Sequence, residues 1–67
     1  MTHEEAKQKA TEWSNLIADA ECEAENGCHG ASERLIAEAR AIEQSMGEAG
    51  WDAATVLRQT QERRRAL

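Results

Sequence analysis

Residues 6–27 read AKQKATEWSNLIADAECEAENG, and this stretch has the apolar spacing of a long amphipathic helix. Small and apolar residues recur at alternating intervals of four and three: Ala6, Ala10, Trp13, Ile17, Ala20 and Ala24. That spacing is the heptad pattern with which one helix packs along another. Asn26 and Gly27 end the pattern, because glycine readily adopts the left-handed conformation that closes a helix.

The start of this helix is marked by a capping box, in which Thr2 stands three residues before Glu5. In such a box the Thr side chain accepts a hydrogen bond from a backbone N–H of the first turn, and the Glu side chain reaches back to the cap. The negative charges of Glu4 and Glu5 also favour the positive end of the helix dipole. We therefore expect a helix over residues 2–26.

Two shorter helices are expected after a glycine-containing loop. The first covers residues 31–46, where apolar residues again recur at helical spacing. The second covers residues 52–65, because Asp52 suits the N-cap of a helix. Trp51 and Val56 flank this cap at the spacing of a hydrophobic staple, in which the two side chains pack on each other.

The composition favours helices throughout. The 67 residues include no Pro, Phe or Tyr, and their β-branched residues are few and scattered. A chain of this length forms one domain, so residues 1–67 are expected to form a single helical unit. We predict an all-α fold in which the first two helices form an antiparallel hairpin and a shorter third helix packs on it.

Large apolar residues are few for a stable monomer. Ten lie between residues 13 and 57, and a domain of this size buries only about 60% of the surface that its unfolded chain exposes. Self-association would thicken this core, so we expect a homodimeric helix bundle. The predicted dimer interface is the seam of the first helix: Ala6, Ala10, Trp13, Ile17 and Ala20.

Two cysteines and a histidine lie close together in the sequence. Cys22 is expected in the last turn of the first helix and Cys28 just after it, so these two are candidates for a disulfide. Together with His29 they have side chains that bind zinc, but a structural zinc site takes four ligands. The whole first helix separates His3 from this group. We therefore expect no metal and no cofactor.

The charges are unevenly distributed along the chain. Eleven acids and four basic residues give residues 1–50 a charge of −7, whereas four Arg and two acids give residues 51–67 a charge of +2. The acids of the first helix form either a solvated face or a patch that docks on a basic partner. The arginines are too few to offset the acids, so we expect no direct binding to nucleic acid.

Motifs of known enzymes and membrane proteins are missing from the sequence. It has no G-x-S-x-G, no H-E-x-x-H and no phosphate-binding glycine loop, and Cys28 and His29 are neighbours that rarely point at each other. A membrane-spanning helix needs about 18 or more apolar residues, and no such run exists. The acidic start does not resemble a signal peptide. We expect a cytoplasmic protein that is not an enzyme.

These observations predict a small non-catalytic protein-interaction module. We expect an adaptor or inhibitor that binds and blocks another protein, with a composition typical of phage or mobile-element accessory proteins. The predicted partner-binding residues are the two tryptophans and the acids of the first helix: Trp51, Trp13, Asp19, Glu21, Glu23 and Glu25. Two alternatives stay open: an acidic mimic of nucleic acid that inhibits a DNA- or RNA-binding protein, and a sensor of metal or redox state that uses Cys22, Cys28 and His29.

Overall fold

The chain folds into three helices and the turns between them. The computed structural model describes the backbone of residues 1–65 and the side chains of residues 1–62. Helix α1 spans His3–Glu25, α2 spans His29–Glu48 and α3 spans Ala53–Arg65. Residues 1–65 contain no β-strand, so the all-α prediction is confirmed for this part of the chain.

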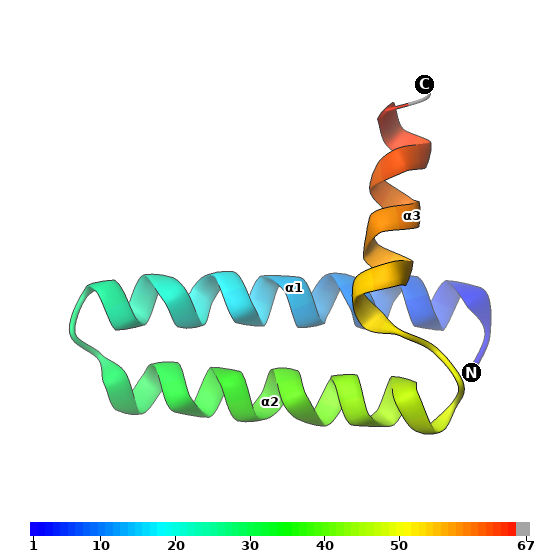
Figure 1. Cartoon of the computed structure of the whole chain (residues 1–67). Coiled ribbons are helices and arrows are strands. Elements are labelled where there is room, and N and C mark those ends of the chain that lie inside the picture. Colours follow the sequence, from blue (N-terminus) through cyan, green and yellow to red (C-terminus); the bar gives the residue numbers. More distant parts are fainter. Residues whose placement is uncertain (66–67) are drawn as a thin grey trace.

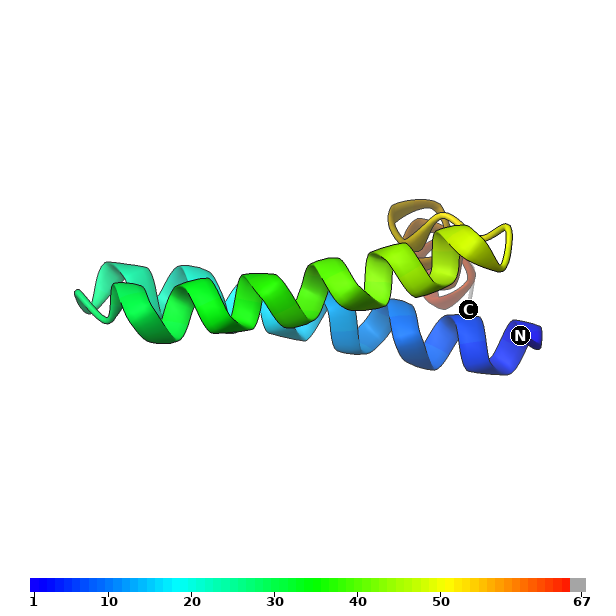
Figure 2. The ribbon, with the colours of Figure 1, turned by 90° about the horizontal axis from the view of Figure 1, so that it is seen from below.

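The three helices form an L. Helices α1 and α2 lie side by side along their lengths, joined by a short turn at one end (Figure 1). Helix α3 crosses one side of this pair near the N-terminus of α1 and extends past α1 (Figure 1), and the second view shows α3 nearly end-on at that end of the pair (Figure 2). The molecule measures 37 × 29 × 13 Å, and its smallest dimension is close to the width of a single helix, about 10–12 Å with side chains.

Polar side chains cap the first and third helices as the sequence predicts. The Thr2 hydroxyl oxygen accepts a hydrogen bond from the backbone N–H of Glu5 at 3.2 Å. At the start of α3, the Asp52 carboxylate accepts one bond from the Thr55 N–H at 3.1 Å and one from the Thr55 hydroxyl at 2.5 Å. These bonds satisfy N–H groups that have no partner inside the helix.

Two glycines in the left-handed conformation end α1 and α2 in the same way. Gly27 has φ of 83° and Gly50 has φ of 85°. In each turn the following residue, Cys28 or Trp51, donates a backbone N–H to a carbonyl oxygen five residues earlier, at 2.8 Å. The glycine itself donates to the carbonyl three residues earlier, at 3.1 Å for Gly27 and 3.0 Å for Gly50. Both turns are therefore Schellman motifs.

Helix α2 is longer than the predicted range of 31–46. It begins at His29 and ends at Glu48, because Gly30 and Gly47 both keep negative φ and lie inside the helix. The predicted start after Gly30 and the predicted end before Gly47 are therefore both wrong. Only Gly27 and Gly50 close turns, and the first turn is left with three residues between α1 and α2.

The core lies at the end of the α1–α2 pair where α3 crosses it. Its buried members come from all three helices: Ala6, Ala10, Met46, Ala53 and Val56. Four partly buried apolar residues pack around them: Trp13, Ile42, Trp51 and Leu57. Met46 is completely buried, whereas the other large side chains of this group, apart from Val56, keep some contact with solvent.

Candidate functional site

The half of the α1–α2 pair that points away from α3 has few large side chains inside. We call residues 16–41 the arm. Its buried residues are all small: Ala20, Ser32 and Ala39 are 2%, 6% and 3% exposed. Larger apolar side chains of the arm, such as Leu16 and Leu35, are only partly buried. Small residues let the two helices pack closely, and the apolar area that remains faces solvent.

Ile36 is the most exposed large apolar side chain within the described helices, with 39% of its surface accessible. It lies in a shallow groove of about 590 Å³ along α2, which we call the Ile36 groove. Two alanines and three polar residues complete the lining: Glu33, Ala37, Arg40, Ala41 and Gln44. The lining thus combines three apolar side chains with three polar ones, which we call its polar rim. The sequence analysis did not single out Ile36 as a candidate site residue.

The predicted acidic residues gather at the C-terminal half of α1. Asp19, Glu21 and Glu25 are exposed, and Glu23 is partly buried. Among the side chains of residues 1–62, the two ion pairs are Lys7 with Glu4 and Lys9 with Glu12, both at 3.6 Å in the N-terminal half of the helix. The last turn of α1 holds no basic residue, although a helix C-terminus favours positive charge. Among the side chains of residues 1–62, the acids in the C-terminal half of α1 therefore form no ion pair.

Cys22 and Cys28 are both exposed and unbonded, so the candidate disulfide is not formed in the structure. The Asn26 amide lies 3.8 Å from the Cys22 sulfur. A hydrogen bond to the Glu23 side chain, together with repulsion by its negative charge, raises the pKa of the Cys28 thiol above its ordinary value. A thiol held in its protonated form is a poorer nucleophile and a poorer metal ligand.

The histidines and cysteines do not meet in one place. His3 lies at the opposite end of α1 from Cys28, beside Trp51, and the His3 and Trp51 rings are 5.6 Å apart with a tilt of 55°. Across the part of the chain that the structure describes, no three His, Cys, Asp or Glu side chains are grouped to hold a metal ion. Trp51 and Trp13, predicted as partner anchors, are partly buried against the core cluster.

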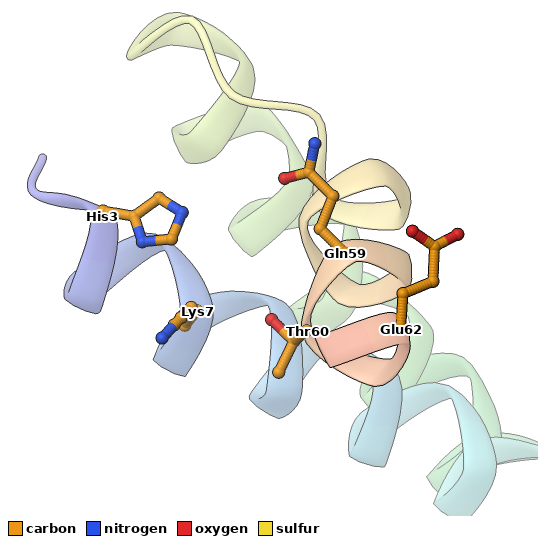
Figure 3. Close-up of a pocket in the computed structure, with 5 residues that line it drawn as sticks. All are labelled: His3, Lys7, Gln59, Thr60 and Glu62. Carbon is orange, nitrogen blue, oxygen red and sulfur yellow. The ribbon is translucent and has the colours of Figure 1, made fainter. Parts of the chain in front are cut away.

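A cavity of about 400 Å³ lies in the corner between the start of α1 and the outer half of α3. Figure 3 shows the five polar side chains that line it: His3, Lys7, Gln59, Thr60 and Glu62. The Thr60 hydroxyl donates to the carbonyl oxygen of Val56 at 3.0 Å, and the Lys7 ammonium lies 3.6 Å from Glu4. Two of the five side chains thus have partners outside the cavity.

The alanines of the predicted dimer interface lie inside the single chain. Ala6, Ala10 and Ala20 are 0%, 1% and 2% exposed, because α2 and α3 of the same chain cover them. Trp13 and Ile17 remain partly exposed. A second copy could reach these two from the surface, but it would contact the three alanines only if the α1–α2 pair opened.

Comparison with known proteins finds no matching family model, no matching curated protein and no matching solved structure. Within the described residues, no helix is both long enough and apolar enough to cross a membrane. The site residues are therefore interpreted from the geometry of this chain.

Proposed function

We propose that this chain is a non-catalytic protein-interaction module, an adaptor or inhibitor, and that it binds another protein at the Ile36 groove. One observation carries the proposal: the exposed side chain of Ile36 lies in the middle of a helix, between two alanines and a polar rim. Burying the rest of one Ile side chain contributes about 1 kcal/mol. The folded chain leaves this contribution unused.

The shape of the groove favours a protein as its occupant. Its lining residues all come from the single helix α2, so it has no opposing wall with which to enclose a small molecule. Ala37 and Ala41 lie four residues apart on one side of the helix, where their short side chains allow a second helix to approach closely. Glu33 and Arg40 offer charges of both signs at the rim, which suit a partner of matching pattern.

The test compares three baits in affinity capture followed by mass spectrometry: the wild-type chain, Ile36→Glu and Ser45→Glu. Ser45 is exposed on the same helix but does not line the groove, so its variant adds the same charge elsewhere. The proposal expects a protein that binds the wild type and Ser45→Glu, and binds Ile36→Glu at least about tenfold more weakly. Equal capture by all three baits would show that the groove is not the contact surface.

A further inference from the structure

Helix α3 is longer than its contact with α1 requires. Ala53 and Val56 are buried and Thr60 is partly buried, but Gln61 and Glu62 are exposed. The outer half of the helix extends past α1 into open space (Figure 1). At about 1.5 Å per residue, residues 61–65 project by about 8 Å, which is close to the spacing of two packed helices. Residues 61–65, which we call the overhang, are therefore long enough to cross one more helix.

The overhang is basic. Beyond Thr60, positions 63 and 64 fall three and four residues further along the helix, on the side that packs on α1. Both positions hold Arg, and with Arg65 against Glu62 they give the second half of α3, residues 59–65, a charge of +2. The side of α3 that meets α1 through Val56 and Thr60 thus continues beyond α1 to two positions that hold Arg in the sequence.

The matching negative charge is on α1, but at its far end. Asp19, Glu21 and Glu25 are exposed and have no ion pair among residues 1–62. Figure 1 places the C-terminal end of α1 at one extreme of the molecule and α3 towards the opposite end, so the two charges do not meet within one chain. They would meet if a second copy lay alongside in the opposite direction.

We propose that two copies of this chain form a dimer in which the α3 overhang of each copy crosses the acidic half of α1 of the other. With the two α1 helices antiparallel, the C-terminal half of each lies beside the N-terminal half of the other, where the overhang passes. A two-fold axis then relates the two contacts, so the same contact occurs twice, as in a closed dimer. The inside corner of the L that would receive the second copy is hollowed to about 180 Å³ and is lined by Thr11, Ser14, Asn15, Leu57, Thr60 and Gln61.

This dimer differs from the one expected from the heptad seam, and it is independent of the Ile36 groove. It uses exposed residues and leaves Ala6, Ala10 and Ala20 in the core of each copy. The Ile36 groove lies on α2, outside the proposed contact, so each dimer would present two grooves. A module with two identical binding surfaces gains avidity for a partner that offers two sites.

Light-scattering mass after size exclusion tests the dimer, with the wild type and two charge-reversed variants. The wild type is expected near twice 7.4 kDa at low salt and to dissociate as salt rises, because the contact is electrostatic. The acid-reversed variant, Asp19→Lys/Glu21→Lys/Glu25→Lys, should raise the dimer Kd at least about tenfold. The arginine-reversed variant, Arg58→Glu/Arg63→Glu/Arg64→Glu, should do the same, and a mixture of the two should recover a dimer.

Two controls separate a lost contact from a lost fold. Lysine at the C-terminal half of α1 favours the helix dipole, so the acid-reversed variant should keep its helical circular dichroism. Glu33→Lys/Glu38→Lys/Glu43→Lys makes the same charge change on α2 and should leave the dimer intact. The neutral variant Arg63→Gln/Arg64→Gln should weaken the dimer without reversing charge. A wild type of 7.4 kDa at every concentration, or a mixture that stays monomeric, would overturn the proposal.

Discussion

The backbone N–H of Cys28 donates to the carbonyl oxygen of Glu23 at 2.8 Å, and the same turn brings the Cys28 thiol to the Glu23 carboxylate. The equivalent bond at the other Schellman turn joins Trp51 to Met46, also at 2.8 Å. There the paired side chains are apolar and belong to the core. The same turn geometry thus ends α1 at a polar turn and α2 at an apolar turn.

Replacing Glu23 by Gln should make Cys28 more reactive. The change removes the negative charge that raises the pKa of the thiol, so the thiolate fraction at pH 8 should rise. Alkylation of Cys28 by iodoacetamide, measured in a Cys22→Ser background, should become faster. The midpoint of the curve of alkylation rate against pH should move to lower pH. Glu25→Gln, which removes an exposed acid two residues away, should have a smaller effect. Equal rates in the two variants would mean that Glu23 does not control the thiol.

The cap of α3 should make the protein sensitive to acid. The Thr55 hydroxyl and N–H bond the carboxylate of Asp52 and hold its pKa below the ordinary value of 3.8. Because the folded-state pKa is the lower one, this stabilisation is present above pH 3.8 and is lost as the pH falls through the folded-state value. The difference in melting temperature between the wild type and Asp52→Ala should therefore be largest near pH 7 and narrow in acid. A difference that is constant with pH would exclude a contribution from the charge.

Met46 should be the most costly side chain to truncate. It is completely buried among residues of all three helices, so Met46→Ala removes apolar contacts and leaves a cavity. We expect a loss of about 2–5 kcal/mol in the free energy of unfolding, measured by urea denaturation. Ile36→Ala, at a position 39% exposed, should cost well under half as much. Similar losses in the free energy of unfolding for the two variants would mean that Met46 is not at the centre of the core.

The four glycines should divide into two pairs when each is replaced by Ala. Gly27 and Gly50 have positive φ, so an Ala there should destabilise the fold by about 1–2 kcal/mol. Gly30 and Gly47 lie in α2, where an added Cβ meets nothing within 4 Å. Ala at these two positions should stabilise the fold by about 0.5–1 kcal/mol. Thermal or urea unfolding of the four single variants measures the change in the free energy of unfolding. This change should be negative for the two turn glycines and positive for the two helical glycines, and the same sign for both pairs would contradict the division.

Local signals predicted the ends of α1 and the start of α3 well, because a cap depends on neighbouring residues. The hydroxyl of Thr2, the carboxylate of Asp52 and the flexibility of Gly27 each act within a few residues of the chain. The predicted range 31–46 was too short for α2, since nothing local distinguishes the helical glycines Gly30 and Gly47 from turn glycines when the flanking sequence tolerates both.

The candidate site was harder to predict, because a periodic pattern identifies a face but not what covers it. The seam through Ala6 and Ala10 does pack against helices, but these are α2 and α3 of the same chain. Ile36 follows the partly buried Leu35 directly, and one residue turns the side chain by about 100° around the helix. Which of the two faces α1 depends on how the turn after Gly27 sets the rotation of α2, and that rotation arises only from packing.

A molecule only 13 Å thick in one direction has a gradient of local stability along its length. Met46 and its neighbours hold the end at α3, whereas small residues such as Ala20 and Ala39 hold the arm. Backbone amides near Met46 should therefore exchange with solvent only when the whole chain unfolds, and those of the arm through smaller openings. A partner bound at the Ile36 groove, as proposed, would contact a surface that lies largely on the more readily opened arm, while the end that carries α3 remains fixed.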